Sequence, residues 1–183
     1  LLFPWVARAH AQLEWLDRAG APRSARSLPE GDWELLALSP DQRVAAATRD
    51  GDLWQVDLER SVATRLARSV ASEQRAAWSP DGRRLALSRG HGRAVLDIIH
   101  AGSGVVDSVP SVQALFQDVQ DWTPDGRALV VAVLGRSGEA GPTTSWDIWT
   151  VPLDGSAPTP YVVTPGLERL ARISPDGRWL LWQ

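Results

Sequence analysis

The 183-residue chain contains no cysteine, methionine, lysine or asparagine, so all nineteen of its basic residues are arginine. Without cysteine, disulfides and thiolate metal sites are excluded. Apolar runs all fall well short of the roughly 20 residues that span a bilayer, so we expect no membrane segment in this chain. The formal net charge of −3 offers little attraction for nucleic acid, and we expect no nucleic-acid partner.

Tryptophan, glycine and proline are abundant, with ten, fifteen and thirteen copies, and hydrophobic residues make up 44% of the chain. These residues are spread over many short apolar runs separated by turn-forming residues. Such a composition favours an all-β fold.

A Ser-Pro-Asp-Gly motif, or a near copy of it, occurs four times, and successive copies are 40, 44 and 51 residues apart. Proline presets φ for a turn, aspartate accepts a backbone N–H within it, and glycine supplies a positive φ, so we interpret the motif as structural. Its residues are Pro40, Asp41, Pro80, Asp81, Gly82, Pro124, Asp125, Gly126, Pro175, Asp176 and Gly177. The first copy has Gln42 in place of glycine, and we expect that turn to be one residue shorter.

Each motif lies between two short apolar strands, and a third and fourth strand follow in the first three repeats. Four strands per repeat at this period predict a partial β-propeller built from four-stranded antiparallel blades. We expect three full blades at 33–69, 74–109 and 118–164, and partial blades at 13–32 and 168–183, after a lead-in at 1–12. Most of the tryptophans are expected to pack between blades.

The segments 77–88 (AWSPDGRRLALS) and 173–180 (ISPDGRWL) resemble the TolB-like propeller repeat, a WD40-like repeat of the Pro-Asp (PD40) type. The resemblance covers residue 13 to the end of the chain. Residues 13–20 (LEWLDRAG), followed by 38–41 (LSPD), also resemble the start of the propeller attached to bacterial serine/threonine protein kinases. This second resemblance implies a periplasmic or extracytoplasmic sensor or interaction region, and it transfers no kinase residue to this chain.

Catalytic signatures are missing from the sequence. The histidines (His10, His91 and His100) have no metal-ligand spacing, and Ser137 is out of frame for a nucleophile elbow. We therefore expect no catalytic residue, metal ligand or cofactor.

Loops between second and third strands are the candidate binding surface, because loops on a rigid scaffold often carry function. Their candidate residues are Arg49, Arg89, His91, Arg93 and Arg136, suited to carboxylates or an acidic partner.

The sequence leaves three functional hypotheses open, because one fold hosts many functions. The first is a non-catalytic module of a kinase that binds a protein or small-molecule ligand. The second is the gating propeller of a prolyl-oligopeptidase-type serine peptidase, and the third is a free-standing periplasmic TolB-like scaffold protein. We also expect the remaining blades to lie elsewhere in a longer parent chain, and the isolated piece to self-associate through uncovered blade faces.

Overall fold

The computed structural model describes residues 17–21, 32–68, 75–89, 95–109, 112, 114–135 and 145–183. These residues form three four-stranded antiparallel sheets and one two-stranded hairpin, and they contain no helix. In these ranges, accordingly, no helix has the length and apolarity needed to cross a membrane. The predicted all-β class and partial propeller are confirmed.

Each sheet is a simple meander, in which strands adjacent in sequence are hydrogen-bonded neighbours. The first sheet holds β1 (Glu34–Leu38), β2 (Val44–Arg49), β3 (Asp52–Asp57) and β4 (Val62–Ala67). The second holds β5 (Ala76–Trp78), β6 (Arg84–Arg89), β7 (Val95–His100) and β8 (Val106–Val109). The third holds β9 (Phe116–Trp122), β10 (Ala128–Leu134), β11 (Trp146–Pro152) and β12 (Thr159–Val162), and the hairpin pairs β13 (Arg172–Ile173) with β14 (Leu180–Leu181).

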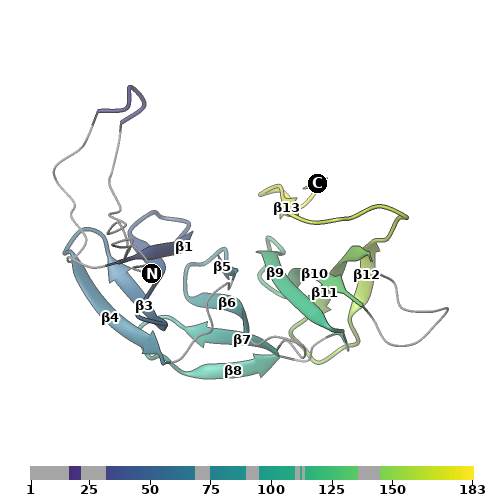
Figure 1. Ribbon diagram of the computed structural model, residues 1–183, viewed down its shortest axis with the longest axis horizontal. Helices are drawn as coiled ribbons and strands as arrows, with labels where there is room; N and C mark the ends of the chain where they lie inside the picture. Colours follow the sequence, from purple (N-terminus) through teal and green to yellow (C-terminus); the bar gives the residue numbers. More distant parts are fainter. Residues whose placement is uncertain are drawn as a thin grey trace, which may run out of the picture.

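The sheets stand side by side like the ribs of a fan (Figure 1). The first strands β1, β5, β9 and β13 lie along the inside of the arc, where β1 contacts β5, β5 contacts β9 and β9 contacts β13. The fourth strands β4, β8 and β12 lie along the outside. This radial order is that of propeller blades arranged around an axis.

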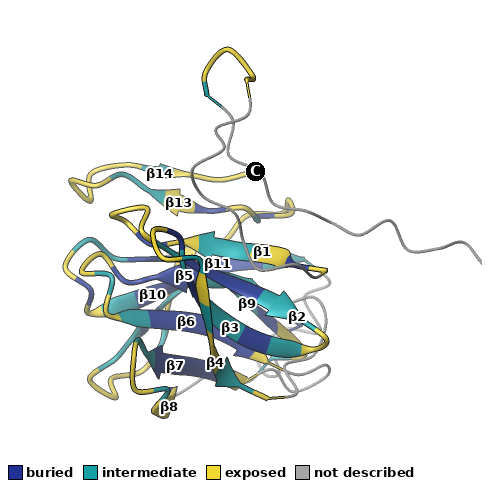
Figure 2. Cartoon of the chain, turned by 90° about the vertical axis from the view of Figure 1, so that its left-hand side faces the viewer, coloured by how far each residue is buried: buried dark blue, intermediate teal, exposed yellow. Residues whose placement is uncertain are grey.

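The middle strands of each sheet bury both of their faces. In β6, Leu85 and Leu87 face the first sheet, whereas Ala86 packs in the cluster shared with the third sheet. Side chains alternate between the two faces of a strand, so a strand buried on both sides must be a continuous apolar run. Figure 2 shows the result, with β6 and β7 largely buried and the hairpin β13–β14 largely exposed.

The repeated turns share one hydrogen-bond pattern, in which the first residue supplies a hydroxyl. In the second turn, Ser79 Oγ donates to Asp81 Oδ1 at 2.6 Å and accepts from the amide of Arg84 at 2.9 Å. The aspartate also accepts the amide of Arg83 at 3.0 Å, and Gly82 N–H closes the turn on Ser79 O at 2.8 Å. The hydroxyl residues at this position are Ser39, Ser79, Thr123 and Ser174.

The expectation of a shorter first turn is wrong. Gln42 has a φ of 58°, close to the 67° of Gly82, and its amide donates to Ser39 O at the same 2.8 Å. The turn therefore keeps its full length, with a glutamine held in the left-handed region. That conformation costs an L-residue roughly 1–2 kcal/mol, and the hydroxyl–aspartate network around the turn stabilises it.

Consecutive turns also lie beside one another. A Cβ atom added to Gly82 would lie 3.7 Å from Cδ of Pro40, and one added to Gly177 would lie 3.5 Å from Cγ of Pro124. These are ordinary contact distances, so the positive φ rather than crowding requires glycine at these positions. The contact also shows that the proline of one repeat packs on the turn of the next.

Tryptophan side chains connect neighbouring inner strands. Trp122 at the end of β9 is buried and donates its indole N–H to the carbonyl of Ala77 in β5 at 2.8 Å. Trp78 makes the equivalent contact with Ala37 of β1 at the longer distance of 3.4 Å. Of the tryptophans in the described residues, Trp33, Trp78, Trp122 and Trp149 are buried, Trp54 and Trp146 are half-buried, and Trp179 and Trp182 are exposed.

The hairpin β13–β14 is attached differently, because Ile173 occupies the tryptophan position. Its backbone amide donates to Asp121 Oδ2 at 3.0 Å, and the guanidinium of Arg172 donates to the carbonyl of Gln120. Of the partial blade predicted at residues 13–32, only residues 17–21 and 32 are described. Residues 17–21 form a turn in which the Gly20 amide donates to Asp17 O, and the remainder of the predicted blade lies outside the described residues.

Replacing Gln42 with glycine is expected to raise the free energy of unfolding by about 0.5–1 kcal/mol, because the left-handed strain exceeds the extra entropy of an unfolded glycine. The reverse change at the equivalent position, Gly82→Gln, is expected to lower it by about 1 kcal/mol or more. Urea unfolding of the two variants and the unmodified chain measures both effects. Changes of the same sign in the two variants would contradict the shared geometry.

Replacing Trp122 with phenylalanine is expected to lower the free energy of unfolding by about 1–3 kcal/mol, because a short buried hydrogen bond and part of the packing are lost. Trp78→Phe removes a similar area but a longer and weaker hydrogen bond, so its effect is expected to be smaller. Urea unfolding of both variants compares the two. Equal losses would mean that the indole hydrogen bond contributes nothing beyond packing.

Candidate functional site

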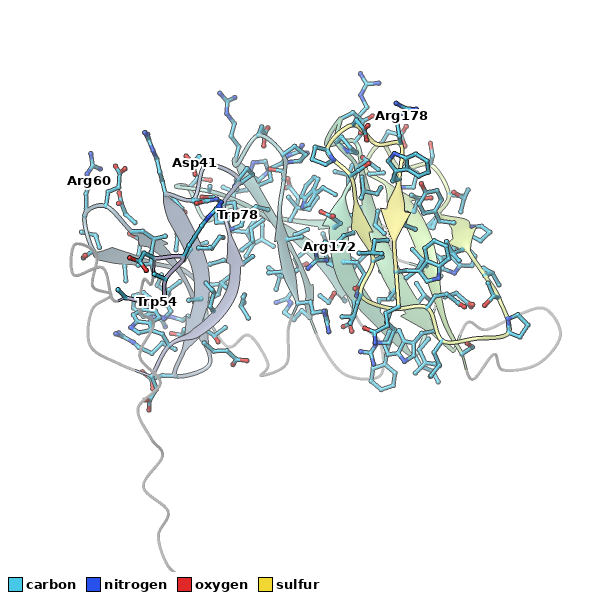
Figure 3. All side chains as sticks on the ribbon, turned by 90° about the horizontal axis from the view of Figure 1, so that it is seen from above. Asp41, Trp54, Arg60, Trp78, Arg172 and Arg178 are labelled. Carbon is cyan, nitrogen blue, oxygen red and sulfur yellow. The ribbon has the colours of Figure 1, made fainter. Side chains whose placement is uncertain are left out.

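The two edges of the sheets differ in what they carry. The proline-led turns join first to second strands, and Asp41, Arg60 and Arg178 lie along the upper edge in Figure 3. Because the strands are antiparallel, the connections between second and third strands, and those between sheets, leave from the opposite edge. We call this opposite edge the loop face.

A pocket of about 310 Å³ opens on the loop face near the inside of the arc. Its volume lies near the lower end of the range for small-ligand sites. Two of the residues that line it precede inner strands: Arg75 comes directly before β5, and Arg169 comes shortly before β13. The remaining lining residues are Leu167, Leu170 and Gln183. We call it the Arg75–Arg169 pocket.

One carboxylate holds both arginines of the pocket. Arg75 Nε lies 4.0 Å and Arg169 Nη2 lies 3.5 Å from the same oxygen, Oδ2 of Asp118 in β9. The side chains of Arg75 and Arg169 are 40% and 42% exposed. The three residues come from three successive repeats, so the site exists only when the sheets pack in order.

Arg169 is fixed in place by further contacts. Its guanidinium carbon lies 4.4 Å from the ring centre of Trp146, a stacking distance at which a cation is attracted to the aromatic face. Its backbone amide and carbonyl both pair with Gln183. A guanidinium held this way loses less side-chain entropy on binding a ligand.

A buried pair of carboxyl groups anchors the segment that carries Arg169. Asp147 of β11 and Glu168 are both buried, and Glu168 donates its backbone N–H to Trp146 O at 2.8 Å. Thr164 donates its hydroxyl to Glu168 Oε1. Residues 164–169, which we call the strap, are thus tied to the start of β11.

The environment of this pair raises the pKa of Asp147 above its ordinary value of 3.8. Burial is the largest cause, followed by the negative charge of Glu168 and a side-chain hydrogen bond with it. The four turn aspartates show the opposite effect, because the neighbouring hydroxyl and backbone N–H lower the pKa values of Asp41, Asp81, Asp125 and Asp176.

Arg49, one of the binding residues predicted from the loops between second and third strands, packs among aromatic rings. Its guanidinium carbon lies 4.6 Å from the ring centre of Trp33 and 4.8 Å from that of Trp54. The two rings meet edge to face with centres 5.9 Å apart. In this position Arg49 covers the outer face of the first sheet, and it does not line the Arg75–Arg169 pocket.

Arg89, a second of the predicted binding residues, forms an ion pair at 2.8 Å with Asp97 of β7. The Asp97 side chain is only 3% exposed and also accepts the hydroxyl of Ser108. Removing one partner of such a pair leaves a buried charge, so Arg89 supports the second sheet. The other predicted binding residues, His91, Arg93 and Arg136, lie outside the described residues.

Sequence reasoning missed the residues of the pocket. It considered loops within each sheet, whereas Arg75, Asp118 and Arg169 lie where the chain enters the first strand of a repeat. A signal was available, because all three stand five or six residues before a motif proline. Their proximity, however, depends on the packing of three sheets. Among the described residues there is also no group of three or more histidine, aspartate or glutamate side chains suited to a metal ion.

Comparisons with known proteins support the fold. No protein-family model matches the chain, and no curated protein matches it. Solved structures do match: TolB from Acinetobacter baumannii aligns with a TM-score of 0.73 and 15% identity, over 93% of this chain and 42% of that one. The putative TolB from Agrobacterium tumefaciens aligns with a TM-score of 0.74 and 19% identity, over 96% of this chain and 63% of that one.

The chain has a TolB-like β-propeller fold. Dipeptidyl peptidase 4 from Porphyromonas gingivalis also aligns, with a TM-score of 0.60 and 12% identity, over 87% of this chain and 30% of that one. The chain therefore spans less than two thirds of the length of each of these structures. At these identities the TolB-like likeness establishes the arrangement of sheets, and the function has to be argued from the site.

Asp147→Asn is expected to raise the free energy of unfolding at pH 7 and to flatten its dependence on pH. The raised pKa of Asp147 means that its carboxyl group holds a proton more tightly in the folded chain than in the unfolded chain, so the contribution of Asp147 to stability is greatest below about pH 4 and falls as pH rises through its folded pKa. Asparagine keeps a donor toward Glu168 and carries no charge. Thermal unfolding between pH 4 and 8 measures the slope.

The matched control is Asp52→Asn in β3. The two aspartates hold equivalent positions in their sheets, because each lies opposite the residue nine positions after a motif proline on the neighbouring strand: Asp52 opposite Arg49, and Asp147 opposite Val133. Asp52 differs in having a cationic partner, since Arg65 Nη1 lies 3.1 Å from its carboxylate. Its replacement is expected to lower stability by about 0.2–1 kcal/mol, as for a partly exposed ion pair. A stability gain in the control, or none in Asp147→Asn, would contradict the assignment.

Proposed function

We propose that this chain is a non-catalytic propeller module that binds a ligand at the Arg75–Arg169 pocket, and that it is the extracytoplasmic sensor part of a bacterial serine/threonine protein kinase. The observation that carries the binding role is the pocket itself. Its two arginines come from the second and fourth repeats and share Asp118 of the third, so a ligand that contacts both arginines connects the repeats on either side of the third sheet.

Such a ligand alters the energetic balance between sheets, and this is the property that a sensor needs. A ligand shifts a conformational equilibrium only by its difference in affinity for the two states. At this pocket the difference arises whenever the second sheet, the third sheet and the hairpin change their mutual spacing, because Arg75 and Arg169 then change their distance from Asp118.

The kinase assignment rests on the resemblance of residues 13–20 and 38–41 to the propellers attached to such kinases. A location outside the cytoplasmic membrane belongs to the same proposal. The second candidate is a gating propeller of a serine peptidase. It is favoured by the structural likeness to the P. gingivalis peptidase, of which this chain covers 30%.

The coding sequence around this chain separates the two candidates. The kinase proposal expects a Gly-rich loop, His-Arg-Asp and Asp-Phe-Gly motifs upstream, followed by an apolar segment of about 20 residues. A Gly-x-Ser-x-Gly motif downstream, with no kinase upstream, would select the peptidase instead.

Autophosphorylation by the parent protein in membranes tests the sensor role. Arg75→Gln and Arg169→Gln are each expected to change its rate, because both alter the pocket that connects the sheets. Arg60→Gln on the opposite edge is the control and is expected to leave the rate unchanged, since its side chain is 82% exposed. Unchanged rates in both pocket variants would reject this pocket as the sensing site.

A further inference from the structure

The Arg75–Arg169 pocket has a chemical character that narrows the class of its ligand. It combines two guanidinium groups with two leucine side chains, and a single carboxylate, Asp118, lies between the arginines. The two guanidinium groups that line the pocket supply hydrogen-bond donors for an anionic ligand.

In the ion pairs of the described residues, Asp118 contacts the two arginines of the pocket through only one of its oxygens. Each guanidinium carries five N–H donors, and the two groups share one oxygen at 4.0 and 3.5 Å, both longer than the 2.7–2.9 Å of a strong charge-assisted hydrogen bond. A second carboxylate between the same arginines gains bidentate hydrogen bonds that Asp118 does not make. Arginine is suited to this role because its planar fork matches carboxylate geometry.

The leucines supply the apolar part of the site. Leu167 is 64% exposed and Leu170 is 42% exposed, so burying them under a ligand removes apolar surface from water. Leu170 has a φ of 55°, a conformation that is rare and strained for a residue of its size. Strained residues of this kind gather at ligand sites, where the surrounding structure fixes a side chain in a required position.

From these features we propose that the pocket binds a carboxylate attached directly to an apolar group, such as the free carboxyl terminus of a peptide that ends in leucine. The carboxylate lies between Arg75 and Arg169, and the apolar side chain lies against Leu167 and Leu170. A volume of about 310 Å³ accommodates roughly one residue of this size. This proposal rests on the proposed function in one respect, because both place the ligand in the Arg75–Arg169 pocket.

The test uses ligands that differ only in charge. N-acetyl-L-leucine and N-acetyl-L-leucinamide have the same shape, and two pentapeptides ending in Leu-Leu, one with a free acid and one with an amide, extend the comparison. Binding to the 183-residue chain is measured by calorimetry and by ligand-observed NMR at low salt. The acid of each pair is expected to bind about tenfold or more tightly than its amide, because only the acid makes charge-assisted hydrogen bonds.

Two variants assign the binding to this pocket. Arg75→Gln and Arg169→Gln are each expected to reduce the affinity for the acids about tenfold and to leave that for the amides nearly unchanged. Arg60→Gln on the opposite edge is the matched control and is expected to retain full affinity. Because Arg169 also stacks on Trp146, Arg75→Gln keeps the test valid if Arg169→Gln unfolds.

The relative affinities of the acids and the amides decide whether the proposed ligand class is correct. Equal affinities for acid and amide overturn the proposal, as does acid-selective binding that survives both arginine variants. Acid-selective binding lost in the variants supports it, and a further gain of the pentapeptide acid over N-acetyl-L-leucine identifies a peptide terminus rather than a small free acid. If no acid binds while the pocket variants still alter autophosphorylation by the parent, the ligand class is wrong and the sensor function stands.

Discussion

The packing of each four-stranded sheet against the next is the constraint on which the rest of this structure depends. The middle strands are apolar on both faces, as Leu85, Ala86 and Leu87 show, so no sheet can bury its core alone. Two devices repeat at every junction between full sheets. The proline of one turn packs on the turn of the next repeat, and an indole N–H reaches back to the preceding inner strand.

The local part of this arrangement could be predicted from sequence because its causes are local. Proline, aspartate and a left-handed residue specify a turn within four residues, and the apolar runs on either side specify the strands. The error at Gln42 shows the limit of this reasoning. A missing glycine suggested a shorter turn, but the hydroxyl of Ser39 bonds to both Asp41 and the amide of Val44 and holds the same geometry around a glutamine.

The candidate site was much less predictable, because its causes are distant in sequence. Arg49 and Arg89 were chosen for their loop positions, yet the surfaces that receive them, two tryptophan rings and a buried aspartate, are not implied by spacing. Asp118 meets arginines 43 and 51 residues away. No periodic pattern within one strand brings such residues together; only the curvature of the arc does.

The strap connects the proposed binding pocket to the sheet behind it. Glu168 is bonded through its backbone to Trp146 and lies beside Asp147, while the adjacent Arg169 stacks on the Trp146 ring. The buried acid pair and the pocket guanidinium are therefore anchored to neighbouring residues of one strand. A ligand that draws Arg169 away from Asp118 must carry the ring with it or break the stack. Arg169 of the pocket and strand β11 are linked in this way through two consecutive residues on each side, Glu168 and Arg169 of the strap and Trp146 and Asp147 of the strand.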